Sequence, residues 1–280
     1  MKNIIDAICT LINRRDNLLS TGQFGSNRIN AVGYVLEDYI KDLFADAFDC
    51  SPFERMQRQS AAFSYLGNDA NPPDIMLHGG DAIEVKKIQS ENAALALNSS
   101  YPKQFLICDD PLLSNACRAA EDWRVKDIVY AVGVVNGDRI KHLCMVYGRD
   151  CCASAECYDR VRNSIKQGVE TSAGLEFAPT RELGRVNRVD PLGITYLRIR
   201  GMWHIENPWR VFNYVYERNP QANFNFMCII NTAKWNELRN LNVLFELQKH
   251  YPTLRIVDVK IHDPDNPARL NDAKLIRYEF

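Results

Sequence analysis

The stretch PPDIMLHGGDAIEVKKI, residues 72–88, places two short apolar runs on either side of a Gly-Gly pair. Such runs around glycines are typical of a β-hairpin. A three-residue turn at 79–81 would pair Ile75 with Val85 and make one face of the hairpin apolar, with Gly80 available for the left-handed position of such loops. A two-residue turn would mix polar and apolar side chains on both faces. The apolar pattern therefore predicts the longer turn.

Polar side chains gather on the second face of this hairpin. Directly opposed residues share a face, so the predicted register puts Asp74 across from Lys86, with Glu84 on the same side. Two close carboxylates repel each other unless a hard cation lies between them, and oxygen ligands favour Mg²⁺ or Mn²⁺. With a lysine beside them, they predict metal-assisted hydrolysis of a phosphodiester. The alternative is a solvated strand face on which Lys86 only forms an ion pair.

The rest of the chain alternates between helical and strand-like patterns without repeats, which predicts a mixed α/β fold. Helices are expected at about 2–19, 28–48, 111–123, 153–168 and 232–249. Strands are expected at 73–78, 82–88, 103–108, 127–135, 140–148, 194–205, 223–231, 254–262 and 274–279. Residues 169–192 are expected to be irregular.

Composition excludes several classes of protein. The 280 residues are 46% hydrophobic and 25% charged, so the chain can bury a core and is not generally disordered. No apolar run approaches the roughly 20 residues that a membrane helix needs. Residues 1–20 form an amphipathic pattern unlike a signal peptide, and the nine cysteines are most simply free thiols, so we expect a cytoplasmic protein.

Pro73-Asp74 followed by Glu84-Val85-Lys86 resembles the motif of the PD-(D/E)XK nuclease superfamily. The resemblance implies that Asp74 and Glu84 bind metal and that Lys86 is the catalytic lysine. It also implies the fold of that superfamily, a mixed central β-sheet flanked by helices, with additional segments that contact DNA. We expect one endonuclease domain over 1–280, with a catalytic core at about 25–150 and DNA recognition with the remaining sheet elements at about 151–280.

Many members of this superfamily add an acidic residue from a preceding helix, in a context such as Gly-x-x-Leu-Glu. Residues 33–37, GYVLE, match that context and make Glu37 a further candidate ligand. Glu37 could equally be a helix-surface residue that pairs with Lys41 one turn later. The sequence leaves both interpretations open.

The chain as a whole resembles the NgoPII-type restriction endonucleases, most clearly over EVKKIQSENAALALNSSYPK, residues 84–103. This resemblance implies a type II enzyme that cuts double-stranded DNA at a short palindrome, GGCC, with Mg²⁺ as cofactor and Mn²⁺ as a substitute. A palindrome implies a homodimer in which each subunit reads one half-site. A cell with such an enzyme would also need a DNA methyltransferase that protects its own sites.

Charge is balanced in total, at −1, but not along the chain. Residues 1–100 carry nine basic and 13 acidic side chains, whereas residues 160–210 carry nine basic and five acidic ones. Arginine suits guanine edges and phosphates. The candidate DNA contacts from this region and from the segment after the catalytic strand are Arg181, Arg185, Arg188, Arg198, Arg200, Lys87, Gln89, Ser90, Asn98, Ser99 and Lys103.

Two alternatives remain open. One is a PD-(D/E)XK repair or junction nuclease, and the other is a non-catalytic DNA-binding protein whose Glu-x-Lys is a surface feature. A phosphatase or nucleotide hydrolase is disfavoured because no Gly-rich phosphate loop occurs. A second acidic-x-Lys sequence, Asp258-Val259-Lys260, has no preceding Pro-Asp strand, so we expect a solvated strand face there.

Overall fold

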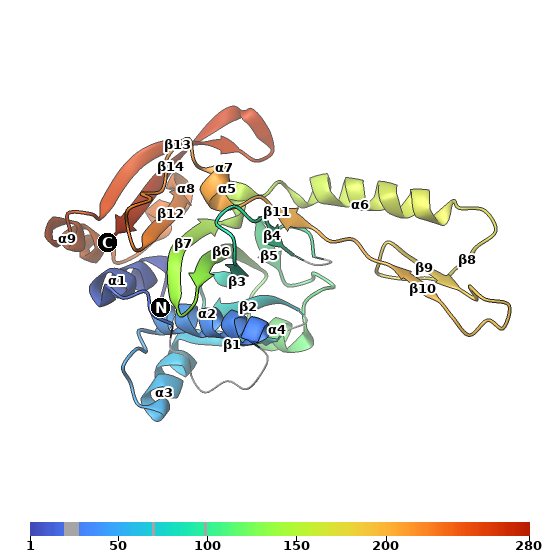
Figure 1. Ribbon diagram of the computed structural model, residues 1–280, viewed down its shortest axis with the longest axis horizontal. Helices are drawn as coiled ribbons and strands as arrows, with labels where there is room; N and C mark the ends of the chain where they lie inside the picture. Colours follow the sequence, from blue (N-terminus) through green and yellow to red (C-terminus); the bar gives the residue numbers. More distant parts are fainter. Residues whose placement is uncertain (20–27, 69–70, 98–99) are drawn as a thin grey trace.

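The centre of the fold is a mixed β-sheet with helices around it (Figure 1). The computed structural model describes residues 1–19, 28–68, 71–97 and 100–280, without the side chains of 28–33. The sheet order is β1-β2-β3-β6-β7-β12-β14-β13, with β5 paired to β6 off this path. The pairs β3–β6 and β7–β12 are parallel, and the other pairs are antiparallel. The predicted α/β fold with a mixed central sheet and flanking helices is confirmed.

The helices are α1 (Ile4–Arg14), α2 (Arg28–Ala45), α3 (Pro52–Ala62), α4 (Asn115–Ala119), α5 (Gly148–Cys151), α6 (Ala155–Glu170), α7 (Pro208–Val211), α8 (Thr232–Glu237) and α9 (Leu241–His250). The strands are β1 (Phe63–Asn68), β2 (Asn71–Leu77), β3 (Ala82–Ile88), β4 (Leu95–Ala96), β5 (Phe105–Ile107), β6 (Val125–Asn136), β7 (Arg139–Tyr147), β8 (Glu176–Phe177), β9 (Gly184–Asn187), β10 (Leu197–Ile199), β11 (His204–Ile205), β12 (Asn225–Asn231), β13 (Arg255–Asp263) and β14 (Asn266–Glu279). No described helix is long and apolar enough to span a bilayer.

Each face of the central sheet has its own hydrophobic core. On one face Ile75, Ile83 and Val129 pack with residues of α1 and α2. On the other face Met76 and Tyr130 pack with residues from α4, α7 and the loops beside them. Along β2, β3 and β6, successive apolar side chains therefore point alternately into one core and into the other. The sheet is therefore covered on both sides.

The predicted register of the β2–β3 hairpin is wrong by two residues. Ile75 pairs with Ile83, not with Val85, and Gly79 rather than Gly80 adopts the left-handed conformation, with φ of 60°. The loop occupies 78–80, because Leu77 N bonds to the carbonyl of Asp81 at 3.0 Å. A shift of two residues preserves the alternation, so the predicted division into apolar and polar faces still holds.

Tertiary contacts account for the shift. The carboxylate of Asp81 is buried, where it accepts hydrogen bonds from Lys234 Nζ at 2.6 Å and from Tyr147 OH at 2.8 Å. Lys126 Nζ donates to the carbonyl oxygens of Leu77 and Gly80. Because these partners hold Asp81 in place, Asp81 pairs with Leu77 and does not form part of the turn.

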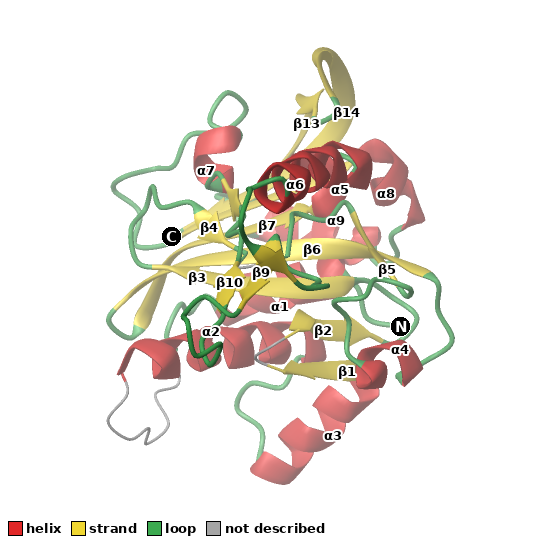
Figure 2. Cartoon of the chain, turned by 90° about the vertical axis from the view of Figure 1, so that its right-hand side faces the viewer, coloured by secondary structure: helices red, strands yellow, loops and turns green. Residues whose placement is uncertain are grey.

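An extended arm, α6 together with the small sheet β10-β9-β8, projects from the main body (Figures 1 and 2). The sequence prediction treated 169–192 as irregular, although it contains β8 and β9. The predicted strand at 194–205 is two short strands, β10 and β11, and the predicted helix at 232–249 is divided into α8 and α9 near Asn240, which has φ of 65°. The prediction also missed α3 and β1.

Candidate active site

Asp74, Glu84 and Lys86 lie together where β2 and β3 diverge. The paired part of the ladder ends at Ile75, and beyond it Val85 N donates to Asp74 Oδ2 at 2.6 Å. Lys86 Nζ lies 2.7 Å from Glu84 Oε1. The structure thus brings the two carboxylates and the lysine together, as the face alternation predicts, although Asp74 is not directly opposite Lys86.

The electrostatics of this group suit a cation. Burial, followed by the negative charge of Glu84, raises the pKa of Asp74 to about 8. Burial opposes the charge of Lys86, but Glu84 and Asp74 outweigh it and raise the pKa of Lys86 above its usual value. Glu84 Oε2 is buried without a hydrogen-bond partner in the described part of the chain. A hard cation between Asp74 and Glu84 would relieve their repulsion and occupy the unpartnered oxygen, so these residues fit a divalent metal.

Gly67 on β1 allows the backbone of Asp74 to come close. A Cβ at position 67 would lie 2.6 Å from the carbonyl oxygen of Pro73 and 2.8 Å from Cα of Asp74. Both atoms belong to the backbone, so they could not move aside without displacing the strand. The edge strand therefore positions the aspartate through a contact that only glycine permits.

Glu37 lies in the same cavity, on α2. It forms an ion pair with Lys41 at 2.6 Å, and its charge acts on both Asp74 and Lys86. Within the described ranges, no three His, Cys, Asp or Glu side chains form a cluster suited to a metal ion. The structure therefore shows the predicted pairing with Lys41, and it places Glu37 in the lining of the same cavity as Asp74 and Glu84.

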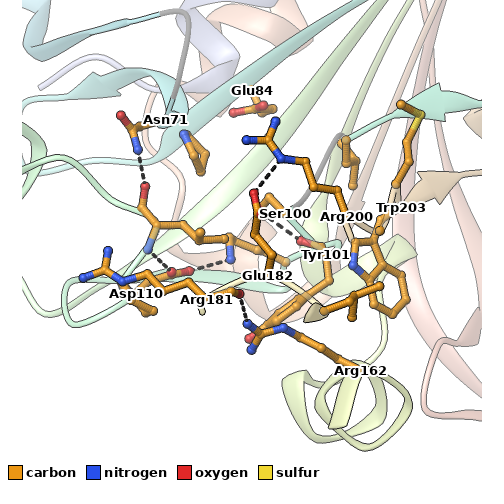
Figure 3. A pocket seen from close by; sticks show the side chains of 18 of the residues that line it. Asn71, Glu84, Ser100, Tyr101, Asp110, Arg162, Arg181, Glu182, Arg200 and Trp203 are labelled. Carbon is orange, nitrogen blue, oxygen red and sulfur yellow. Dashed lines mark hydrogen bonds and ion pairs between the residues drawn. The ribbon is translucent and has the colours of Figure 1, made fainter. Parts of the chain in front are cut away.

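A cavity of about 1500 Å³ extends from this group to the arm. Figure 3 shows Glu84 in its wall together with Arg162, Arg181, Glu182 and Arg200 from the arm. Carboxylates from β2, β3 and α2 line one part of the cavity, and arginines line another. A polyanion could bind the cationic wall while one of its phosphates lies beside Asp74, Glu84 and Lys86, which together form the hairpin group.

Two comparisons with known proteins bear on this geometry. The sequence model of the NgoPII restriction endonuclease family matches residues 2–262. The type II restriction enzyme NgoPII of Neisseria gonorrhoeae is 55% identical over 279 residues, which is 99% of this chain and 100% of the relative. The chain belongs to the NgoPII restriction endonuclease family. No solved structure matches significantly.

Restriction endonucleases of this type are site-specific deoxyribonucleases, so DNA is the substrate of the family and a divalent metal is its general cofactor. Of the predicted DNA contacts in this family member, five line the cavity: Lys103, Arg181, Arg185, Arg198 and Arg200. Lys103 is buried and forms an ion pair with Asp110 at 2.5 Å. Its ammonium group is therefore already engaged in the cavity wall.

Among the other predicted contacts, those that the structure describes are not in the cavity lining. Arg188 is an exposed residue 3.5 Å from Glu176. Gln89 and Ser90 lie on an exposed turn after β3, and Lys87 points to the opposite face from Lys86 because side chains alternate along the strand. Asn98 and Ser99 lie outside the described residues. Contact with DNA stays a prediction for this whole set.

The sequence prediction missed several residues of the cavity wall. Trp203 packs against the core and edge-on against Tyr101 and Tyr158, and it also lines the cavity. Glu182 and Arg162 are also in the lining. The local sequence around Glu182 and Arg162 predicts only a polar segment. It does not indicate which of its side chains face Asp74, Glu84 and Lys86.

The second acidic-x-Lys sequence is a surface feature, as expected. Lys260 pairs with Asp272 at 2.7 Å, and Asp258 pairs with Lys274, both across the β13–β14 hairpin. On the opposite face of β13, Ile261 is buried whereas Val257 is 42% exposed.

Proposed function

We propose that this chain hydrolyses phosphodiester bonds of double-stranded DNA at the palindrome GGCC, with Mg²⁺ as its metal and Mn²⁺ as a substitute. The observation that carries the proposal is the meeting of Asp74, Glu84 and Lys86 in a cavity with a second, arginine-bearing wall. Membership of a restriction endonuclease family supports the reaction class. GGCC itself rests on resemblance to that family and on the suitability of arginine for guanine.

Each hairpin residue has a role in the proposal. Asp74 and Glu84 supply oxygen ligands, and the carboxylate of Glu37 on α2 adds negative charge that acts on Asp74 and Lys86. A divalent metal, when bound, polarises a phosphoryl oxygen and acidifies water. Lys86, which the carboxylates keep charged, orients the attacking water and stabilises negative charge that grows on the phosphate. The buried surroundings strengthen these interactions because they reduce screening by solvent.

The arginine wall binds the DNA in this proposal. Arg181, Arg185, Arg198 and Arg200 can each donate to phosphate or to a guanine edge, and phosphate contacts would fix the position of the duplex. A palindromic site requires two such subunits related by two-fold symmetry, so we propose a homodimer. The host would carry a methyltransferase for the same sequence as a functional partner, without a physical complex.

Digestion of a mapped plasmid tests the proposal. The enzyme is incubated with Mg²⁺, with Mn²⁺, and with Mg²⁺ plus EDTA, and the ends of the fragments are sequenced. Discrete fragments whose ends all map to GGCC sites of the plasmid, lost with EDTA, are expected. A metal-dependent smear would instead support a repair-type nuclease, and DNA binding without cleavage under all metal conditions would support the non-catalytic alternative.

A mixed-subunit experiment tests the homodimer. Wild type is refolded or co-expressed with an excess of the Asp74→Asn variant, and a supercoiled plasmid with one site is digested. If each subunit cuts one strand, nicked circles accumulate before linear DNA. A monomeric enzyme would show only a lower rate, with the same ratio of nicked to linear product as wild type alone.

A further inference from the structure

Glu182 binds two of the arginines in the cavity wall at once. Arg198 donates from Nε to Oε2 at 2.9 Å and from Nη2 to Oε1 at 2.6 Å, and Arg200 donates from Nε to Oε1 at 2.5 Å. The hydrogen bonds from Arg198, together with those from Arg200, lower the pKa of Glu182. All three side chains line the cavity, and Figure 3 shows Glu182 beside Arg200.

Backbone hydrogen bonds of the arm fix the position of Glu182 and its two arginine partners. Leu183 N bonds to the carbonyl of Ile199 at 3.0 Å, which continues the β9–β10 pairing to the residue beside Glu182. Glu182 N also bonds to Thr180 Oγ1 at 3.1 Å. The Glu182 side chain is only 15% exposed, whereas Arg198 and Arg200 are 49% and 56% exposed. The two guanidinium groups thus cover most of the carboxylate and remain half-exposed themselves.

The two faces of the arm sheet differ in character. Arg198 lies opposite Arg185 in the β9–β10 ladder, so both side chains point to the same face. On the other face, Val186 is buried, and a Cβ at Gly184 would come within 2.9 Å of Val169 on α6. The sheet is therefore supported from behind by α6 and presents its arginines to the cavity.

An arginine that is held along one edge keeps further N–H groups free to donate elsewhere. Arg198 uses Nε and one hydrogen of Nη2, and Arg200 uses Nε, so each retains N–H donors at its terminal nitrogens. Both groups share Oε1 of Glu182, which keeps two like charges closer together than they would lie alone. Consecutive base pairs of DNA are separated by about 3.4 Å along the helix axis. A closely spaced pair of guanidinium groups suits two neighbouring guanines, each of which offers O6 and N7.

We infer that Glu182 is a positioning residue for sequence recognition, which holds Arg198 and Arg200 so that they read two consecutive guanines of each half-site. The inference rests on the proposed function and extends it to the residues that distinguish the site. Glu182 would not touch the DNA. It would reduce the cost of ordering two long side chains, and it would offset their mutual repulsion before DNA arrives.

The Glu182→Gln variant tests the inference, with Glu176→Gln as the matched control. Glu176 is an acidic residue of the same arm that pairs with Arg188 outside the cavity lining. Binding is measured without divalent metal by fluorescence anisotropy, using a duplex with the site that wild type cuts and duplexes in which each G·C pair is replaced in turn. Single-turnover cleavage of the same duplexes is measured with Mg²⁺, and the melting temperature of each variant shows that it is folded.

Glu182→Gln is expected to bind the correct site about tenfold more weakly, whereas its affinity for substituted duplexes is unchanged or higher because one negative charge is gone. Discrimination therefore falls by about tenfold or more, and the cleavage rate at saturating DNA falls less than the affinity does. Glu176→Gln should keep the discrimination of wild type. Equal weakening on all duplexes, or unchanged discrimination in Glu182→Gln, would overturn the inference while leaving the proposed function intact.

A double-mutant cycle separates positioning from general electrostatics. If Glu182 acts through Arg198, the Arg198→Ala variant should lose discrimination at one base pair, and adding Glu182→Gln should cost less than it does in wild type. Additive losses would contradict coupling between the two residues. Failure of wild type itself to cut DNA at any site would refute the proposed function, irrespective of Glu182.

Discussion

Asp74 Oδ2 accepts a hydrogen bond from the backbone N of Val85 at 2.6 Å, so a side chain takes the place of a backbone partner where the two strands part. This bond holds the aspartate against the strand that carries Glu84 and Lys86. The β2–β3 ladder ends at Ile75, so the position of Asp74 relative to Glu84 depends on this side-chain hydrogen bond.

Glu37→Gln should raise the Mg²⁺ concentration needed for half-maximal cleavage by about tenfold, because it removes a carboxylate that acts on Asp74. The measurement is a metal titration of single-turnover cleavage. Asp38→Asn is the control, since Asp38 also pairs with Lys41, at 3.7 Å, and with Arg55, at 3.5 Å, but does not line the cavity. An unchanged titration curve for Glu37→Gln would show that Glu37 serves only as the partner of Lys41.

Gly67→Ala should reduce the cleavage rate by about 100-fold, because the new methyl group would displace the backbone at Asp74 by several tenths of an ångström or more. The rate is measured at saturating Mg²⁺ and DNA. Gly168→Ala, in α6 with no atom near its added methyl group, should keep full activity. Wild-type activity in a folded Gly67→Ala enzyme would mean that Asp74 does not need its present position.

His142 predicts a dependence of stability on pH. Burial, followed by the charge of Arg218, lowers its pKa to about 4, although nearby Glu91 opposes the shift. Between this value and the ordinary value near 6.5, His142 binds fewer protons in the folded state than in the unfolded state, so its contribution to stability rises with pH across the window and is lost as pH falls. Across the whole window, the contribution of His142 to the free energy of unfolding changes by about 3 kcal/mol.

Urea unfolding between pH 4 and 7 measures this effect. His142→Gln should be less stable at pH 7, and its free energy of unfolding should rise less, or fall more, with pH than that of wild type, because the raised pKa of Asp74 acts in the opposite direction. His250→Gln, at an exposed position on α9, should keep the wild-type slope. If His142→Gln retains the slope of wild type, the dependence arises from other groups.

The polar face of the hairpin was predictable because side chains alternate along a strand. Once the apolar residues are assigned to one face, the residues between them must lie on the other. The register depended on Lys234, which binds Asp81 from 153 positions away. No local pattern contains that contact. The same reason explains the arm: contacts such as Glu182 with Arg198 join the segment 169–192, for which the sequence predicted no regular structure, to the predicted strand at 194–205.

The division of the 232–249 helix has a local cause that the periodicity concealed. Apolar residues continue through the segment at helical spacing, but Asn240 adopts a left-handed conformation between α8 and α9. Asparagine tolerates that conformation better than most residues do. Lys234, which holds Asp81, lies in the first of the two helices, so the break does not disturb the buried ion pair.

The most direct test of the central claim compares DNA cleavage with DNA binding in variants of the hairpin group. Asp74→Asn, Glu84→Gln and Lys86→Gln should each reduce Mg²⁺-dependent cleavage of a GGCC duplex by at least about 100-fold while DNA binding is retained. The double variant Asp258→Asn, Lys260→Gln, which alters the second acidic-x-Lys sequence on the surface, should cleave like wild type. Undiminished cleavage in the three hairpin variants would contradict the assignment of catalysis to Asp74, Glu84 and Lys86.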